Sequence, residues 1–134
     1  RRGMNPEEEK GVAVKIIISS QGNTPESPVD PRFGRAAQFM LYDTETGAYE
    51  AVSNAESLDA AQGAGIKAAE TLSRLGAEVL ITGHCGPNAF STLRAAGIEV
   101  VQGAEGCTVA QALQKFQSGQ LKAMGSPDVA GHWQ

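Results

Sequence analysis

Residues 78–90 read EVLITGHCGPNAF, and this stretch decides the fold class. Its first five residues are largely apolar and β-branched, which is typical of a short buried strand. The next four residues, GHCG, predict a tight loop. Pro87 suits the first position of a helix, because proline lacks the N–H group that this position leaves unpaired. A strand, a tight loop and a helix in this order indicate an α/β protein.

The same kinds of element continue on both sides of this stretch. Short apolar runs predict further strands at 14–19, 39–43, 48–52 and 98–101, and residues 44–47 supply the turn of a hairpin between the second and third runs. Apolar residues at helical spacing predict helices over 61–75, ending at Gly76, from Pro87 to about Gly97, and from Thr108 to Gly119. The expected fold is α/β, with a mixed five-stranded sheet of an antiparallel hairpin plus parallel strands, and helices on both faces.

The length of the chain fits one domain. A chain of 134 residues can bury a proper core but is too short for two domains. We expect a single α/β domain over residues 13–122. Residues 1–12 are expected to be a disordered lead-in or residues left by cloning, and residues 123–134 a tail without periodicity.

Charge and composition exclude several classes of function. The net charge of −4 argues against a nucleic-acid grip, which needs a basic surface. Apolar runs long enough to span a membrane are absent from the sequence, and its start lacks the apolar core of a signal peptide. Two cysteines without a CxxC motif are too few for a standard iron–sulfur cluster, which usually takes four thiolates. We therefore expect a cytoplasmic monomer that binds neither nucleic acid nor membrane.

Three loops are expected to meet beyond the carboxyl ends of the parallel strands, where open α/β sheets bind ligands. They are residues 20–35, 83–88 and 103–108, and two of them lead into helix N-termini, which favour anions. The candidates for binding an anion are Arg32, Phe33, Gly34, Arg35, Gly83, Gly86, Asn88, Gly103, Gly106 and Thr108. The candidates for contacting a metal are His84, Cys85 and Cys107.

Each candidate also has an interpretation without function. Cys85 at a helix start is either a reactive thiolate or a buried, inert thiol, and Cys107 could pack under the last helix. His84 could be a solvated side chain, and Arg35 could pair with Asp30 or Asp43 and merely fasten its loop. If the cleft hypothesis holds, both cysteines are unbridged and lie at the mouth of the same cleft.

Four segments follow one another along the chain: FGRAxxF at 33–39, GAGxxAA at 63–69, ITGxxGPNAF at 81–90 and AGIxV at 96–100. Together they resemble the dinitrogenase iron-molybdenum cofactor biosynthesis family, over about residues 14–122. The GHCG loop and the short length are especially similar to one small member of sulfate-reducing bacteria. That member is associated with a molybdenum–copper sulfide cluster held non-covalently.

The resemblance implies a ribonuclease-H-like fold that lacks the nuclease carboxylates. It also implies a carrier or scaffold, rather than an enzyme, for a preformed anionic metal–sulfur cluster. The cluster would be a molybdenum–copper sulfide of the thiomolybdate type or a related iron–molybdenum–sulfur cluster, and the protein partners would be cluster-assembly or recipient proteins. Two alternatives remain open: a thiol-dependent redox or transfer enzyme using Cys85, and a small interaction module without a cofactor of its own.

Overall fold

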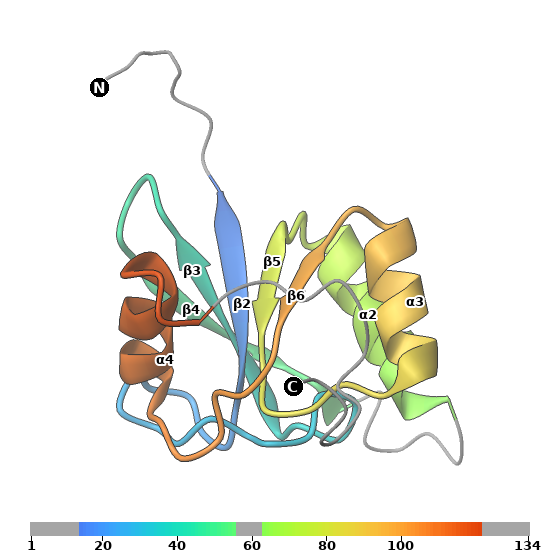
Figure 1. The fold of residues 1–134 in the computed structure, drawn as a ribbon, viewed down its shortest axis with the longest axis horizontal. Coiled ribbons are helices and arrows are strands. Elements are labelled where there is room, and N and C mark those ends of the chain that lie inside the picture. The colour runs from blue at the N-terminus through green and yellow to red at the C-terminus, as the bar shows by residue number, and fades with distance from the viewer. Residues whose placement is uncertain (1–13, 56–62, 122–134) are drawn as a thin grey trace.

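A mixed five-stranded sheet forms the centre of the computed structural model, which describes residues 14–55 and 63–121. The strand order is β4-β3-β2-β5-β6 (Figure 1). The strands are β2 (Lys15–Ser20), β3 (Gln38–Asp43), β4 (Tyr49–Ser53), β5 (Val79–Ile81) and β6 (Glu99–Val101). Counted along the chain the order is 3-2-1-4-5, as expected for a ribonuclease-H-like sheet.

The pairing divides the sheet into an antiparallel half and a parallel half. β3 lies antiparallel between β2 and β4, so that the predicted hairpin forms one edge. β5 lies parallel between β2 and β6, with Leu80 opposite Ile17 on one side and Val100 on the other. All three of these side chains are fully buried. The expected mixed sheet with buried parallel strands is therefore confirmed.

Helices cover both faces of the sheet, as predicted. Helices α2 (Ala64–Arg74) and α3 (Pro87–Ala95) pack on one face, and α4 (Val109–Gln117) packs on the other (Figure 1). Neighbouring residues of β2 alternate between the two layers, because side chains along a strand point to opposite faces. Ile17 faces the layer of α2 and α3, whereas Ile16 and Ile18 face the layer of α4.

The ends of the helices follow the predicted signals. Gly76 and Gly97 have φ angles of 78° and 81° just beyond α2 and α3, a backbone conformation that favours glycine. Helix α2 begins at Ala64, and residues 61–62 of the predicted helix lie outside the described residues. The expected lead-in at 1–12 and tail at 123–134 also lie outside them.

One edge of the sheet positions the candidate site. The parallel strands all end at the lower edge in Figure 1, and the three described helices all begin there. The long segment between β2 and β3 runs along the same edge, as its blue-to-cyan trace shows. Within the described ranges, no helix is long and apolar enough to cross a membrane.

Candidate anion site between two helix starts

A hollow of about 360 Å³ opens at this edge, between the β2–β3 segment and the first turns of α2 and α3. It is lined by Arg32, Phe33, Gly34, Arg35, Gly63, Ala64, Gly65, Ile66, His84, Gly86, Pro87, Asn88 and Ala89. These residues come from three separate parts of the chain. The hollow is thus a product of the tertiary fold and not of a single loop.

Two helix N-termini form part of the walls. Gly63 is the N-cap of α2 and Gly86 is the N-cap of α3, so neither cap residue has a side chain that could accept a hydrogen bond from the first turn. Neither first turn contains an acidic residue. The positive ends of both helix dipoles therefore meet at the hollow without a carboxylate from their own first turns.

Small residues allow the three walls to approach one another closely. A Cβ atom on Gly34 would lie 2.7 Å from both the Cα and the backbone N of Gly65. A Cβ atom on Gly65 would in turn lie 2.9 Å from the Cβ of Ala89. Because real Cβ contacts are longer, only glycine fits at positions 34 and 65 without a shift of the loop or of one helix. The loop, α2 and α3 are thereby fixed against each other.

The loop that carries the arginines is also joined to the loop after β5. Arg32 and His84 form an isolated parallel β-bridge, in which Phe33 N–H donates to the His84 carbonyl oxygen at 3.2 Å. Gly83 lies directly behind, where a Cβ atom would be 2.7 Å from the Cα of Pro31. This bridge places the two loops side by side and brings Arg32 and His84 to the same rim.

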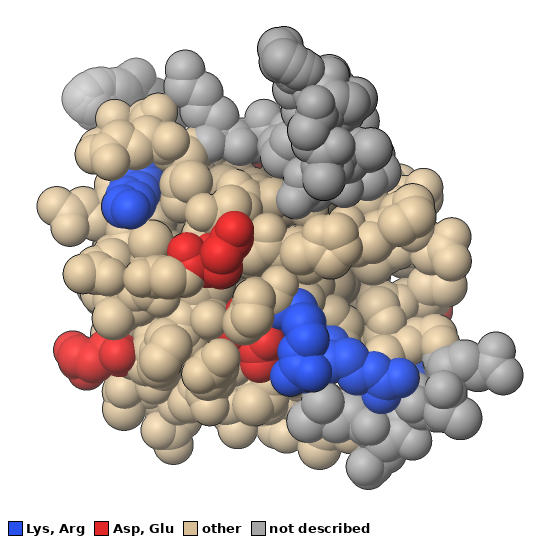
Figure 2. Space-filling model, turned by 60° about the horizontal axis from the view of Figure 1, so that its bottom comes forward, with Lys and Arg blue, Asp and Glu red and all other residues tan. Residues whose placement is uncertain are grey.

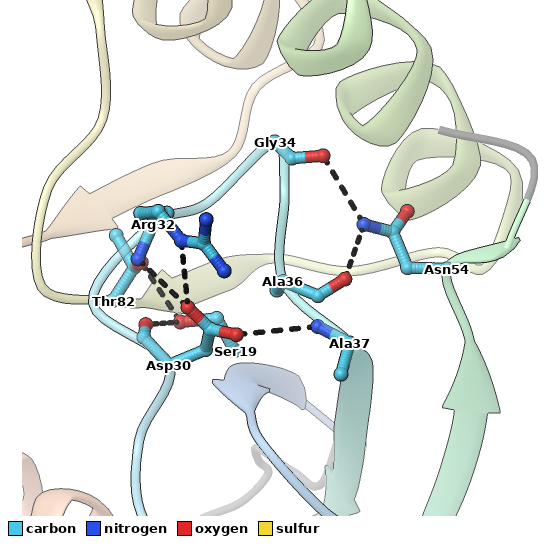
Figure 3. A network of polar contacts seen from close by, with 8 residues as sticks. All are labelled: Ser19, Asp30, Arg32, Gly34, Ala36, Ala37, Asn54 and Thr82. Atoms are coloured by element: carbon cyan, nitrogen blue, oxygen red, sulfur yellow. Dashed lines mark hydrogen bonds and ion pairs between the residues drawn. The ribbon is translucent and has the colours of Figure 1, made fainter. Parts of the chain in front are cut away.

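A buried polar network holds the arginine loop from the inside (Figure 3). The Asp30 carboxylate accepts hydrogen bonds from the backbone N–H of Arg32 at 3.1 Å and of Ala37 at 3.3 Å, and it lies 3.6 Å from Arg32 Nε. On the other side of the loop, Asn54 Nδ2 donates to the carbonyl oxygens of Gly34 and Ala36. Arg32, rather than Arg35, is therefore the arginine that pairs with Asp30.

The charge around the hollow favours an anion. Among the described residues that line it there are two arginines and no carboxylate. Arg32 is largely exposed, and the Asp30 carboxylate beside it is only 3% exposed. Figure 2 shows a contiguous basic group low on this face of the molecule, with one acidic side chain directly beside it and others farther to the left, and a separate basic side chain at the upper left. The local field can thus be positive even though the chain as a whole carries −4.

The dinitrogenase iron-molybdenum cofactor family model matches residues 14–119. The chain belongs to this family. It is 47% identical to the orange protein from Desulfovibrio gigas, whose apo form superimposes with a TM-score of 0.84 over 86% of this chain and 96% of that one. A candidate NifB protein from Thermotoga is 39% identical, with a TM-score of 0.75 over 88% and 99% of the two chains. An uncharacterized protein of Methanocaldococcus jannaschii is 27% identical over 81% of this chain and 90% of its own.

Three of the four family motifs bring residues to the hollow. From the motifs at 33–39 and 81–90, the predicted residues Arg35, Phe33, Gly34, Gly86 and Asn88 line it, as do Arg32 and His84 beside them. The motif at 63–69 contributes Gly63, Ala64, Gly65 and Ile66, which are not among the site residues predicted from the sequence. The start of α2 could have been included from the sequence, because α2, like α3, leads into a parallel strand. Both helices must therefore begin at the same edge of the sheet.

The cysteines do not meet as expected. Cys85 and Cys107 are unbridged, but they are only 1% and 9% exposed and belong to core layers on opposite faces of the sheet. The expectation that both lie at the mouth of one cleft is therefore wrong. Burial also raises the pKa of Cys85 to about 12, which favours the interpretation of a buried, inert thiol over that of a thiolate at the start of α3.

The third predicted loop also lies apart from the hollow. Gly103, Gly106 and Thr108 do not line it, because the chain passes from β6 to α4 on the other face. The first N–H groups of α4 are already bonded: those of Val109 and Ala110 donate to backbone carbonyl oxygens of the β2–β3 segment at 2.9 Å. Thr108 and Gln111 complete a reciprocal capping box. The start of α4 is therefore closed to a ligand, in contrast to those of α2 and α3.

Metal ligation by clustered side chains has no support in the described part of the chain. Among residues 14–55 and 63–121, no group of three or more His, Cys, Asp or Glu side chains is placed to hold a metal ion. His84 is the one predicted metal-contacting residue that lines the hollow. Hydrogen-bond donors and positive charge, rather than a set of metal ligands, thus characterise the site.

Proposed function

We propose that this chain is a non-enzymatic carrier or scaffold that binds a preformed, anionic metal–sulfur cluster non-covalently in the hollow between α2 and α3. The observation that carries the proposal is the lining itself. Within the part of the chain that the structure describes, two helix starts capped by glycine and two arginines, but no carboxylate, line one space of about 360 Å³. Such a surface stabilises negative charge that is spread over a small, compact ligand.

The donor set fits a cluster that arrives with its own sulfur ligands. A bare metal ion would need several thiolates, imidazoles or carboxylates from the protein, and the described residues do not cluster in that way. A thiomolybdate-type unit instead presents sulfide to its surroundings and carries net negative charge. It requires donors that replace its hydration shell, and charge-assisted hydrogen bonds contribute about 1.5–3 kcal/mol each.

The glycines allow such a ligand to reach the backbone. A Cβ atom at Gly63 or Gly86 would meet none of the described residues within 4 Å, so these residues leave the space beside both helix caps open. The φ angle of Gly86 is −70°, a value that any residue can adopt. The backbone conformation therefore does not require glycine at this position. An open cap at the positive end of a helix is the arrangement by which many proteins bind phosphate groups. We infer that the same arrangement here receives a thioanion.

The finer identity of the cluster is part of the proposal. Membership of the dinitrogenase iron-molybdenum cofactor family and the similarity to the orange protein favour a molybdenum-containing cluster. A molybdenum–copper sulfide of the thiomolybdate type is the candidate we prefer, with a related iron–molybdenum–sulfur cluster as the alternative. Proteins that assemble or receive the cluster would be the physiological partners.

Reconstitution tests this function. The metal-free protein is titrated with tetrathiomolybdate and Cu(I), passed through a desalting column and examined for visible charge-transfer bands and for metal content. We expect coloured protein with molybdenum retained, and we expect Cys107→Ser to retain it equally, because that thiol lies under α4 on the other face. Cys85→Ser should also retain most of the colour.

Two results would contradict the proposal. A wild-type protein that leaves the column colourless does not bind the cluster in the proposed way. If Cys85→Ser alone abolishes binding while an arginine reversal has no effect, thiolate ligation and not the anion pocket holds the cluster. Metal analysis of the protein purified from its native source then identifies which metals it carries in the cell.

A further inference from the structure

We propose that Asn54 is a positioning residue of the anion site, which holds the arginine-bearing segment 32–37 in its binding conformation. This inference rests on the proposed function, since it concerns how that site is kept in shape. Asn54 does not line the hollow and would not touch the ligand. It would act through the backbone of Gly34 and Ala36, on either side of Arg35 (Figure 3).

The position of Asn54 in the fold is unusual for a polar side chain. It directly follows β4, an edge strand in which Glu50, Ala51 and Ser53 are exposed, yet Asn54 is only 2% exposed. Burying an amide is unfavourable unless it is hydrogen-bonded. Its Nδ2 atom donates to the carbonyl oxygen of Ala36 at 2.8 Å and to that of Gly34 at 3.2 Å. Both donor positions of the amide thus serve the arginine loop.

Together with Asp30, this amide fixes most of the loop. The carboxylate accepts from the N–H groups of Arg32 and Ala37, the two ends of the segment, whereas Asn54 binds carbonyl groups in the middle. Four backbone groups of six consecutive residues are therefore held by two buried side chains. Fixing a residue's backbone costs conformational entropy, so a loop that is ordered in advance binds its ligand without that loss.

The chemistry of the amide also matters for an anion. Carbonyl oxygens carry partial negative charge, and a free carbonyl group turned toward the hollow would repel the ligand. Figure 3 shows the carbonyl groups of Gly34 and Ala36 turned toward Asn54, which donates to both. An aspartate at this position could not donate to them and would add a negative charge. Asn54→Asp is therefore expected to harm binding more than Asn54→Ala.

The experiment compares affinity with stability. Affinity of each variant for tetrathiomolybdate is measured by fluorescence or absorption titration at 10 °C, where folding is checked by circular dichroism. We expect Asn54→Ala to bind at least fivefold more weakly than wild type, and Asn54→Asp more weakly still. Asn54→Ser, which keeps one donor, should recover part of the loss. The control is Leu113→Ala in α4, which removes core packing on the far face and should lower the melting temperature without changing affinity.

A double-mutant cycle shows whether Asn54 acts through the loop. If it does, Asn54→Ala should add little to the loss caused by Arg35→Glu, because both changes remove the same interaction. Wild-type affinity in folded Asn54→Ala, or strict additivity with Arg35→Glu, would overturn the inference and leave the proposed function intact. If wild-type protein binds no tetrathiomolybdate, the proposed function itself fails and this inference fails with it.

Discussion

Replacing Gly34 by alanine tests whether close contact between the loop and α2 shapes the anion site. The added methyl group would lie 2.7 Å from both the Cα and the backbone N of Gly65, and backbone atoms cannot rotate away as a flexible side chain can. Since carbon atoms pack best at about 3.5–4.0 Å, the loop or the start of α2 must move by roughly 1 Å.

The magnitude follows from two opposing effects. Overpacking of this kind destabilises a protein by about 1–3 kcal/mol. Alanine also reduces the freedom of the unfolded chain, which stabilises by about 0.4–1 kcal/mol. We expect a net destabilisation of about 1–2 kcal/mol, which for a domain near this size lowers the melting temperature by roughly 5–10 °C. The displaced donors should also weaken tetrathiomolybdate binding by about fivefold, equivalent to roughly 1 kcal/mol.

Thermal melts followed by circular dichroism, together with titrations at 10 °C, measure both effects. The matched control is Gly86→Ala, which adds the same methyl group at the same hollow but meets nothing within 4 Å. Gly86→Ala should melt within a few degrees of wild type. The reasoning is refuted if Gly34→Ala is as stable as wild type, or if both alanine variants lose the same stability.

Three further predictions concern charge, capping and the buried thiol. Arg35→Glu should weaken tetrathiomolybdate binding by at least about tenfold, or roughly 1.4 kcal/mol. The same charge reversal at Arg94, in the last turn of α3, should leave binding unchanged. If both variants lose the same amount of ligand on a desalting column, the effect is only one of general charge. Thr108→Ala removes the capping box of α4 and should destabilise the protein by about 1 kcal/mol in urea unfolding without changing affinity, since α4 packs on the other face. In the folded chain the Cys85 thiol keeps its proton up to its raised pKa of about 12. In the unfolded chain the same thiol loses its proton at about pH 8.5. The free energy of unfolding is therefore unaffected by this thiol below the pKa of the unfolded chain, and it decreases as pH rises from there to the pKa of the folded chain. Cys85→Ala lacks the thiol and should lose less stability between pH 8 and pH 10 than wild type does. Equal losses for the two proteins in urea melts at these two pH values would contradict this.

The order and type of the elements could be predicted because local patterns determine them. The β-branched run in β2 and the helical spacing before Gly76 depend only on which faces are buried. Thr108 was recognised as a cap because its hydroxyl group acts on a residue three positions away. These are short-range properties, and the structure confirms each of them.

Which loops share a site depends on long-range geometry. Both cysteines follow parallel strands at the same sheet edge, which made a common cleft plausible from sequence. The right-handed crossovers from β2 to β5 and from β5 to β6 place α2 and α3 on one face, and α4 must then cover the other. Cys85 and Cys107 are separated by that division. The handedness rule contains this information, but it can be applied only once the strand order is known.

The polar contacts behind the arginine loop could not be found from sequence at all. Asn54 lies 20 residues from Gly34 along the chain, and nothing in its immediate neighbourhood marks it as different from other asparagines. Its partners are backbone carbonyl groups, which every residue possesses. The sequence offers both Arg32 and Arg35 as partners for Asp30, and their spacing alone does not tell which arginine turns toward it.

The glycine caps of α2 and α3 have a consequence for the life of the protein in the cell. A ligand that occupies both helix starts binds the folded chain and not the unfolded one, so it shifts the folding equilibrium. At a free concentration one hundred times its dissociation constant, such a ligand adds about 2.7 kcal/mol to the free energy of unfolding. If the proposed cluster binds there, empty molecules would unfold more often than loaded ones and would be degraded sooner, since cellular proteases act on opened chains. The amount of this protein would thereby follow the supply of its cargo without any dedicated regulator.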